Sequence, residues 1–563
     1  MKGFPFFKRL LPALVLLGVG CGGDSTDDRT PAGDQLALSS VTIGGQSGLS
    51  DFDDVSPDAE IVLDFTAALD AATVEANIYL LDAGGAKVDA SDVYDGAKRV
   101  TLKPSAGLNA YASYRLIVDS GLKSAAGEAI LTGKVIRIRT GLDTSDKFPQ
   151  ISDEELLTKV QQQTFRYFWE GAEPTSGMAR ERTSSGATVT TGGTGFGVMA
   201  MTVAAERGFV TRSEACQRVQ RIVTFLAERA TSYHGAFSHW IDGQTGQTLP
   251  FSADDNGADL VETGLLFQGL LTARAYFDGA DAAESKLRAD ITALWEAVEW
   301  DFFTKEGTEK VLYWHWSPDK GWAMNMPIQG WNEALIVYVL AASSPTHPIG
   351  REVYAEGWAR GGAMRNGKLF YDTVLPLGED YGGPLFWAQY SFLGLNPRGL
   401  SDAYADYWEQ VCNHTRINYA YCVDNPKGYA GYGADCWGLT ASDIPDGYTA
   451  SSPTNDRGVI APTAALSSMP YTPDESMAAL RFFYYKLGDK LWSDYGFIDA
   501  FDLTTGWFDR GMHIAIDQGP IVVMIENYRT GLPWNLFMSD KDEQRGLAEP
   551  VSYTHLRAHE TDS

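Results

Sequence analysis

The stretch Ser213-Glu-Ala-Cys-Gln-Arg-Val-Gln-Arg-Ile-Val-Thr-Phe-Leu226 indicates the class of the larger part of this 563-residue chain. Its apolar residues Val219, Ile222, Val223 and Leu226 recur at the spacing of one helix face, and Ser213 precedes them as a candidate N-cap. The same period returns over residues 287–298. Strands do not alternate regularly with these helical segments, so the sequence predicts a large all-α domain and disfavours a parallel α/β sheet.

The distribution of tryptophan marks a domain boundary. All 15 tryptophans lie between Trp169 and Trp534. Residues 36–141 instead show runs of period two, such as Ile61-Val-Leu-Asp-Phe65, that place apolar side chains on one strand face. We expect a linker over 21–35, a small β-sandwich over 36–141 and a helical domain over 150–550. A toroid of helical hairpins with a cleft built by loops is an economical arrangement for a helical domain of that size.

The N-terminal segment has the layout of an export signal. Three basic residues precede an apolar run, Leu10 to Val19, that is too short to span a bilayer. Leu17-Gly-Val-Gly-Cys21 resembles a bacterial lipoprotein signal, in which Cys21 becomes the lipidated first residue. We expect residues 1–20 to be removed and the protein to be exported. A lipid anchor would hold it to a membrane, facing the periplasm or cell surface of a Gram-negative bacterium; plain secretion is the alternative.

The C-terminal segment, residues 551–563, has a different origin. Residues 552–561 back-translate to a sequence that resembles a transposon-end adapter used in preparing sequencing libraries. We interpret this segment as an adapter artefact. His555, His559 and Glu560 are therefore excluded from the chemistry.

The charge balance excludes some partners. Asp and Glu number 73 against 45 Lys and Arg, which gives a net charge of −28. A sequence-independent nucleic-acid binder needs a basic face, so nucleic acid is not an expected partner. The hydrophobic content of 44% excludes general disorder. We expect a folded monomer whose only membrane contact is the lipid anchor.

The sequence contains a glycine-rich motif and a set of cysteines, but the first does not fit a dinucleotide site and the second does not fit a zinc site. Gly193-Thr-Gly-Phe-Gly-Val-Met-Ala200 contains G-x-G-x-x-A but lacks a βαβ unit and a later acidic residue, so close backbone approach at a helix start is the better explanation. A disulfide among Cys412, Cys422 and Cys436 suits an exported protein, with Cys216 as the remaining thiol, but the pairing stays open. Their spacing matches no zinc pattern. We predict no cofactor and no metal.

Aromatic residues gather in or beside loops that also carry Asp, Asn, Gln and Arg. Aromatic faces stack on the C–H faces of sugar rings, while carboxylates and amides bond the hydroxyls, so the pattern favours a neutral polysaccharide or oligosaccharide. Core packing is the alternative for any single tryptophan. The predicted substrate-binding residues are Trp240, Trp314, His315, Trp316, Trp331, Tyr381, Trp387, Tyr390 and Arg180.

Acidic residues at the start of one apolar segment are candidates for catalysis. In Asp254-Asp-Asn-Gly-Ala-Asp-Leu-Val-Glu262, a helix beginning near Asp255 would place Asp255 and Asp259 on one face, with Cβ atoms ~5–6 Å apart. Like charges that close raise one pKa, which keeps a carboxyl protonated for general-acid work. The alternative is that Asp255 is an N-cap and that both acids favour the positive helix end.

A glycosidase needs carboxyls on both sides of the scissile bond, which two acids on one helix do not easily provide. Glu333 is the best opposing carboxyl because it lies in an apolar, aromatic segment, where desolvation raises the pKa as a general acid requires. Asp517 in Ile516-Asp-Gln-Gly-Pro520 is a further candidate. Its alternative role is the N-cap of a helix begun by Pro520.

Several long stretches, in order along the chain, carry a family resemblance: Thr164-Phe-Arg-Tyr-Phe-Trp169, Ala179-Arg-Glu-Arg182, Asp255-Asn-Gly-Ala-Asp-Leu-Val-Glu-Thr263, Tyr313-Trp-His-Trp-Ser-Pro318 and Asp517-Gln-Gly-Pro-Ile-Val-Val-Met-Ile-Glu-Asn527. On these motifs the chain from about Gln163 to Leu547 resembles the glycoamylase-like domain family, which contains the bacterial endo-β-1,2-glucanases of glycoside hydrolase family 144. Residues 63–70 and 108–118 resemble bacterial Ig-like modules, for which we expect a spacer role.

The resemblance implies an (α/α)6 toroid and an inverting glycosidase whose important acids are Asp255, Asp259 and Glu333. We therefore expect an exported hydrolase of β-1,2-linked glucan. Glu333 is the expected general acid, and Asp517 or one of Asp255 and Asp259 directs the water. The alternatives are another glucan linkage, an exo-acting enzyme that releases sophorose, a polysaccharide lyase and a silent glycan-binding lipoprotein.

Overall fold

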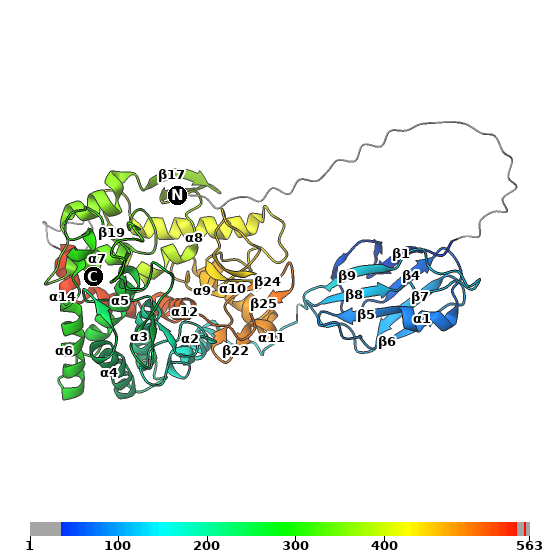
Figure 1. The fold of residues 1–563 in the computed structure, drawn as a ribbon, viewed down its shortest axis with the longest axis horizontal. Coiled ribbons are helices and arrows are strands. Elements are labelled where there is room, and N and C mark those ends of the chain that lie inside the picture. Colours follow the sequence, from blue (N-terminus) through cyan, green and yellow to red (C-terminus); the bar gives the residue numbers. More distant parts are fainter. Residues whose placement is uncertain (1–34, 144, 549–556, 559–563) are drawn as a thin grey trace. The chain divides into compact units, whose positions relative to one another are not determined.

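Figure 1 shows the computed structural model of the chain, coloured along the sequence. The structure describes residues 35–143, 145–548 and 557–558. Two compact units divide between Leu142 and Asp143. The predicted signal peptide and Cys21 lie outside the described residues, as does the predicted adapter segment apart from residues 557 and 558. Within the described ranges, no helix combines the length and the apolar character needed to cross a membrane.

The first unit, drawn mainly in blue in Figure 1, is a two-sheet sandwich. One sheet has the strand order β2-β1-β4-β7-β6 and the other has the order β3-β9-β8-β5. Period two places Ile61, Leu63 and Phe65 of β4 in the core that both sheets share. The predicted β-sandwich is therefore present. Its elements are β1 (Leu38–Ile43), β2 (Gln46–Gly48), β3 (Phe52–Val55), β4 (Ile61–Phe65), α1 (Ala71–Asn77), β5 (Ile78–Asp82), β6 (Ala90–Tyr94), β7 (Arg99–Pro104), β8 (Ser113–Val118) and β9 (Lys134–Thr140).

The second unit is helical, as the periodicity predicts. Its helices are α2 (Asp153–Trp169), α3 (Thr191–Glu206), α4 (Arg212–Glu228), α5 (Leu260–Tyr276), α6 (Ala282–Glu296), α7 (Leu335–Ser343), α8 (Tyr407–Asp424), α9 (Pro462–Leu466), α10 (Pro473–Arg481), α11 (Gly488–Leu491), α12 (Ala515–Arg529), α13 (Leu532–Met538) and α14 (Lys541–Ala548). Short strands occupy the loops between them: β10 (Thr188–Thr190), β11 (Ser232–Tyr233), β12 (Ala236–Phe237), β13 (Trp240–Asp242), β14 (Thr248–Leu249), β15 (Ala258–Asp259), β16 (His315–Trp316), β17 (Arg365–Phe370), β18 (Thr373–Leu377), β19 (Leu400–Ser401), β20 (Ala441–Ile444), β21 (Gly447–Ala450), β22 (Trp492–Ser493), β23 (Gly496–Phe497), β24 (Phe501–Asp502), β25 (Trp507–Phe508) and β26 (Arg557–Ala558).

Helix α4 follows the predicted apolar face, but its N-cap lies two residues before the predicted one. Thr211, not Ser213, is the N-cap: its hydroxyl accepts the backbone N–H of Glu214, and the Glu214 carboxylate accepts the N–H of Thr211. This reciprocal pair satisfies two donors at once, whereas Ser213 would satisfy one. Val219, Ile222, Val223 and Leu226 are buried as predicted.

The glycine motif lets helices pack at backbone distance. Helix α3 packs against both α5 and α12. A Cβ atom on Gly195 would lie 2.2 Å from the carbonyl oxygen of Leu265, and one on Gly269 would lie 2.1 Å from that of Gly195. A Cβ atom on Gly193 would meet the Cβ of Ala515 at 2.6 Å. These positions therefore admit only glycine, and the explanation of the motif by close backbone approach is confirmed.

The cysteines of the helical unit are buried. Cys216, Cys412, Cys422 and Cys436 are all free thiols in this structure. The expected disulfide among the last three is not formed here.

Candidate active site

A cleft of about 400 Å³ opens in the helical unit. Its wall combines aromatic rings with acidic side chains, a composition that suits a polyhydroxylated ligand. The ionisable residues of the wall are Glu181, Arg182, His239, Glu262 and Glu333. The aromatic residues are Trp240, Phe251, Trp314, Phe386, Tyr390 and Tyr448.

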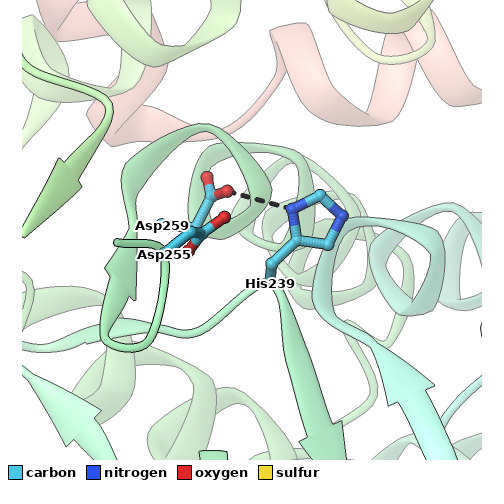
Figure 2. A group of neighbouring side chains, drawn as sticks. All are labelled: His239, Asp255 and Asp259. Carbon is cyan, nitrogen blue, oxygen red and sulfur yellow. Dashed lines mark hydrogen bonds and ion pairs between the residues drawn. The ribbon is translucent and has the colours of Figure 1, made fainter. Parts of the chain in front are cut away.

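A first set of ionisable residues lies at the start of α5, and we call it the histidine group: His239, Asp255, Asp259, Glu262 and His315. Strand β15 pairs with β16, and this pairing sets Asp259 opposite His315. Nδ1 of His239 lies 3.2 Å from Oδ2 of Asp259, as Figure 2 shows. Nε2 of His315 lies 3.1 Å from Oδ2 of Asp255 and 3.4 Å from Oδ2 of Asp259. Two imidazoles therefore share the carboxylate of Asp259.

These contacts fix the charges of the histidine group. Burial disfavours the imidazolium form, but the carboxylates of Glu262 and Asp259 raise the pKa of His239 to about 9. Burial is likewise outweighed at His315, where Asp255 and Asp259 raise the pKa to about 10. Burial would raise the pKa of Asp259, yet His239 and His315 hold it below its usual range. At neutral pH the group thus contains two cations beside an ionised Asp259.

Glu262 connects the histidine group to α3. Its Oε2 accepts the backbone N–H of Gly192 at 2.7 Å and the hydroxyl of Thr190 at 3.2 Å. Nε2 of His239 lies 3.9 Å from its Oε1. Burial raises the pKa of Glu262. The N-terminus of α3 therefore fixes the position of this carboxyl in the cleft wall.

Glu333 lies in the turn that opens α7. The hydroxyl of Ser391 donates to the carbonyl oxygen of Glu333 and accepts the N–H of Ile336, while Oδ1 of Asn332 accepts the N–H of Ala334. These bonds fix the backbone on both sides of the carboxyl. Burial raises the pKa of Glu333 to about 7, and the negative charges of Asp259 and Glu262 act in the same direction. The side chain is thus a neutral proton donor at slightly acidic pH, in the wall of the cleft.

A second set of acids surrounds the start of α12, and we call it the aspartate group: Asp443, Asp499, Asp509 and Asp517, with Arg182. Nη1 of Arg182 donates to both oxygens of Asp443, at 3.0 and 2.9 Å, and its Nε donates to Glu181. The backbone N–H of Asp443 donates to Oδ2 of Asp499 at 2.8 Å. Burial raises the pKa of Asp499 and Asp517, and it raises the pKa of Asp509 to about 7. Of these four acids, the described structure pairs Arg182 with Asp443, and burial favours the protonated form of the other three.

The structure corrects two expectations about helix starts. Asp255 and Asp259 do not share a helix face, because α5 begins at Leu260 and Asp259 is its N-cap, accepting the N–H of Glu262 at 2.9 Å. Asp255 belongs to the preceding loop, and Nε2 of His315 contacts both Asp255 and Asp259. Asp517 is not an N-cap either, since α12 begins at Ala515 and contains Pro520.

The predicted substrate-binding residues divide into two sets. Trp240, Trp314 and Tyr390 line the cleft, and the ring of Phe251 meets Trp240 edge to face at 4.9 Å. The hydroxyl of Tyr390 is buried without a hydrogen-bond partner among the described residues. His315 belongs to the histidine group.

The other predicted binding residues do not line this cleft. Trp331 is 4% exposed and stacks on Phe392 and Tyr407, so it is a core residue. Arg180 donates to the carbonyl oxygens of Gly171 and Gly186 and thereby supports a loop. Trp316 and Tyr381 pack against other aromatic rings, and Trp387 packs against Phe386 of the cleft wall. Packing therefore accounts for the contacts that these residues make here, and their role in substrate binding stays a prediction.

Sequence reasoning missed several residues of the site. Glu262 stands three residues after Asp259, the spacing of an N-cap to N3 pair, and Arg182 ends the quoted motif Ala179-Arg-Glu-Arg182, so both carried a signal. Asp443, Asp499 and Tyr448 come from loops with no distinguishing pattern. Only the fold brings them to the cleft.

Two sets of side chains offer donor atoms within 4.8 Å of one another, as a metal ion needs: His239 with Asp255 and Asp259, and Asp443 with Asp499 and Asp509. Side chains outside the sets already contact a member of each, since His315 contacts Asp255 and Asp259 and Arg182 binds Asp443. The absence of a metal stays a prediction.

Comparisons with known proteins agree on the nature of both units. A family model described as "Putative glucoamylase" matches residues 325–541, and a bacterial Ig-like domain model matches residues 41–137. The crystal structure of a "putative glucoamylase" from Bacteroides uniformis is 56% identical to this chain, with a TM-score of 0.71, over 73% of this chain and 99% of that one. An endo-β-1,2-glucanase structure from Chitinophaga pinensis, in complex with sophorotriose and glucose, is 50% identical, with a TM-score of 0.70, over 72% of this chain and 99% of that one.

A curated relative is longer than this chain. The exo β-1,2-glucooligosaccharide sophorohydrolase (non-reducing end) of Parabacteroides distasonis is 48% identical over 418 residues, which are 70% of this chain and 58% of that protein. This chain therefore spans 58% of the relative's length. Identity at this level over nearly the full length of two solved structures shows the family, and the chain belongs to the glycoamylase-like family, with a bacterial Ig-like domain ahead of its helical domain.

Proposed function

We propose that this protein is a glycoside hydrolase that cleaves β-1,2-linked glucan or glucooligosaccharides. The observation that carries the proposal is Glu333, a carboxyl with a pKa of about 7 in the wall of an aromatic cleft. A carboxyl that is protonated near neutral pH can protonate the oxygen of a leaving sugar. Relatives at 48 and 50% identity act on β-1,2-linked glucans, which supports this linkage for the substrate.

The cleft divides the chemistry among its residues. Glu333 donates a proton to the glycosidic oxygen. Trp240, Trp314 and Phe251 offer faces for the sugar rings, and the free hydroxyl of Tyr390 offers a hydrogen bond to a sugar hydroxyl. The histidine group holds its charges fixed and so orients His239 and Glu262 in the wall.

Asp517 is the proposed general base. It follows Ile516, which lines the cleft, and neither of its oxygens receives a bond from an N–H or hydroxyl donor within the described parts of the chain. Once ionised, a carboxylate with free lone pairs can accept a water proton, although burial and the charges of Asp499 and Asp443 raise the pKa of Asp517 and so favour its neutral form. Asp255 and Asp259 are weaker candidates for the base, because His239 and His315 already occupy them. Separate acid and base carboxyls suit inversion of configuration, the outcome that we propose.

The finer architecture and the location belong to the same proposal. We infer that the helical unit is an (α/α)6 toroid, because α3 and α5 are buried on all sides, as inner helices of such a toroid must be. Export and a lipid anchor at Cys21 are supported by the sequence of the first 21 residues. Labelling with a radioactive fatty acid, compared between the wild type and Cys21→Ala, tests the anchor.

Hydrolysis of linear β-1,2-glucan by the wild type and Glu333→Gln tests the function. We expect new reducing ends with the wild type and almost none with the variant. Unchanged rates in Glu333→Gln would remove Glu333 from the mechanism. A lyase would instead give an unsaturated product that absorbs ultraviolet light, and a glycan-binding protein would bind without releasing reducing ends.

The relatives favour two modes of attack, since one is an endo-glucanase and another releases sophorose from the non-reducing end. Chain-length analysis of early products separates the modes. A ladder of oligosaccharides indicates endo cleavage, and sophorose alone indicates exo cleavage.

A further inference from the structure

We propose that the histidine group is a structural zinc site, in which His239, His315, Asp255 and Asp259 supply the ligand atoms. The proposal goes beyond the proposed function and does not depend on it. It replaces the prediction that no metal binds, which came from the spacing of the cysteines, because the ligands here are histidines and aspartates.

The donor atoms lie at the separations that a tetrahedral ion requires. Nδ1 of His239 lies 3.2 Å from Oδ2 of Asp259, and Nε2 of His315 lies 3.1 Å from Oδ2 of Asp255 and 3.4 Å from Oδ2 of Asp259. Figure 2 shows the ring of His239 beside the carboxyls of Asp255 and Asp259, whose donor atoms all lie within 4.8 Å of one another. With zinc–ligand bonds of about 2.0–2.2 Å, ligand atoms of a tetrahedral site are about 3.3–3.6 Å apart. Small movements therefore suffice to close the four atoms on a zinc ion.

Hydrogen bonds do not account for the position of Asp255. This residue is 3% exposed, and its Oδ2 has no hydrogen-bond partner among the described residues, although Nε2 of His315 lies 3.1 Å away. The pair thus has the distance of a hydrogen bond but not its direction. A buried carboxylate oxygen without a donor is costly, whereas a bound cation satisfies it. Oδ2 of Asp255 is therefore an available ligand directed at the other donor atoms.

The backbone fixes the two aspartates and His315 before any metal binds. Oδ1 of Asp259 accepts the N–H of Glu262 at 2.9 Å, which leaves Oδ2 for the site. The pairing of β15 with β16 sets His315 opposite Asp259. The carbonyl oxygen of Asp255 accepts the N–H of Phe251 at 2.9 Å and so closes the loop before α5. Ligands that are already in place lose little freedom when an ion binds.

His239 is oriented by its neighbours on the remaining side. Its ring stacks on that of Phe251 at 4.2 Å, and its backbone carbonyl accepts the N–H of Thr191 at 3.2 Å. With Nδ1 directed at Asp259, its Nε2 faces Oε1 of Glu262 at 3.9 Å. A carboxylate on the second ring nitrogen is the usual support of a histidine that binds zinc.

Zinc and two protons are alternative occupants of this group. In the metal-free protein the carboxylates raise the pKa of His239 and His315, and each ring holds a proton at neutral pH. Zinc needs neutral imidazoles, so one Zn²⁺ enters as two protons leave to solvent. The net charge of the group is the same in both states.

The number of ligands assigns a structural role to the ion. Four protein ligands fill a tetrahedral zinc site and leave no position for a water or a sugar oxygen. The ion would instead join three segments of the cleft wall: the loop that carries Asp255, strand β16 with His315, and the segment of His239 next to β13. The hydrolytic step proposed for Glu333 does not pass through it.

Zinc titration of the metal-free protein tests the site. The chain is treated with a chelator, dialysed, incubated with ZnCl2 and passed through a desalting column, and the retained zinc is measured by atomic emission. We expect one ion per chain in the wild type and its loss in His239→Gln and His315→Gln. Zinc at 100 times its Kd should also raise the melting temperature of the wild type by about 2–5 °C, but not that of the variants. Full retention of zinc in both variants would overturn the proposal.

Control variants separate this site from other ligands. Asp443→Asn removes a member of the aspartate group, and His347→Gln removes a half-exposed histidine paired with Asp301. Both should keep the ion. Loss of zinc in Asp443→Asn together with retention in His315→Gln would assign the metal to the aspartate group and overturn the proposal. His555 and His559 are replaced by Ala in every protein tested, so that they supply no ligand.

X-ray absorption on the zinc-loaded wild type does not depend on how the variants fold. We expect scattering from two imidazole rings and from oxygen ligands at about 2.0–2.2 Å, without sulfur at about 2.3 Å. A sulfur shell or the absence of imidazole scattering would contradict the assigned ligands. None of these measurements uses activity, so their failure is distinct from a failure of the proposed function.

Discussion

The histidine group and the aspartate group bury carboxyls beside the same cleft, but they neutralise them by different means. In the histidine group two imidazolium rings contact Asp259, and its charge is fixed. In the aspartate group Arg182 pairs with Asp443, and burial favours the protonated form of Asp499 and Asp517. The first group thus holds fixed charges, which can orient a neighbour, whereas the second holds carboxyls that can gain or lose a proton. This difference is the basis for proposing that Asp517, rather than Asp255 or Asp259, activates the water.

The largest effect is expected from replacing Glu333, the proposed proton donor of the cleft. Glu333→Gln keeps the size of the side chain but cannot protonate a leaving group, so we expect kcat to fall about 10²- to 10⁴-fold. Reducing-end assays on β-1,2-glucan measure the loss. A melting temperature equal to the wild type is the control for folding, and wild-type kcat in a folded variant would contradict the role.

Removing the shared carboxylate of the histidine group should mainly lower the free energy of unfolding. Asp259→Ala leaves His239 and His315 without their shared carboxylate, and removing one partner of a buried ion pair typically costs about 3–5 kcal/mol. Urea denaturation measures the free energy of unfolding. Asp254→Ala, which removes a half-exposed acid whose ion-pair partner is Lys320, is the matched control and should cost little. Equal losses in the two variants would show that the histidine group has no special part in folding.

The two imidazolium rings predict the pH dependence of stability. The pKa of His239 is raised from 6.5 to about 9, so its contribution is fully present below pH 6.5 and is lost as the pH rises through about 9. We expect the wild type to lose about 1–3 kcal/mol between pH 6.5 and pH 9.5 that His239→Gln does not lose. Denaturation curves at both pH values give the difference. Parallel losses in the two proteins would assign the pH dependence to the aspartate group instead.

The smallest effect is expected at Tyr390, whose side chain lies near acids of both groups, Asp517 and Glu262. The hydroxyl of Tyr390 has no partner in the described structure, so Tyr390→Phe should leave the melting temperature unchanged. If this hydroxyl binds a sugar hydroxyl, the loss of about 1 kcal/mol should raise KM several-fold with little change in kcat. A lower melting temperature with unchanged KM would indicate a role in packing.

The sequence predicts the local features of this protein better than the contacts between residues that are far apart in the chain. The apolar face of α4 was predictable from its period, although the choice between Thr211 and Ser213 depends on which residue reaches Glu214. Glu333 was predictable because its neighbours in the chain are themselves apolar. The start of α5 was not, because Asp259 takes its cap position only after β15 pairs with β16.

The aspartate group illustrates what one sequence cannot show. The backbone N–H of Asp443 bonds Asp499, and both residues act electrostatically on Asp517, although the three belong to segments that are distant in the chain and share no motif. The aromatic residues show the same limit. Composition favours sugar binding for the set but leaves core packing open for any single tryptophan, and the structure places Trp314 in the cleft wall while Trp331 is 4% exposed.

The glycine contacts between α3 and its neighbours limit how this protein can change. With Gly195 and Gly269 at backbone distance, α3 and α5 cannot slide or separate to fit a wider ligand without losing their interface. Laboratory evolution toward a new linkage or chain length should therefore accumulate substitutions in the loops, for example in the hairpin of β20 and β21 that carries Tyr448, and spare the helices beneath. We thus expect the packed helices to stay constant and the loops to vary.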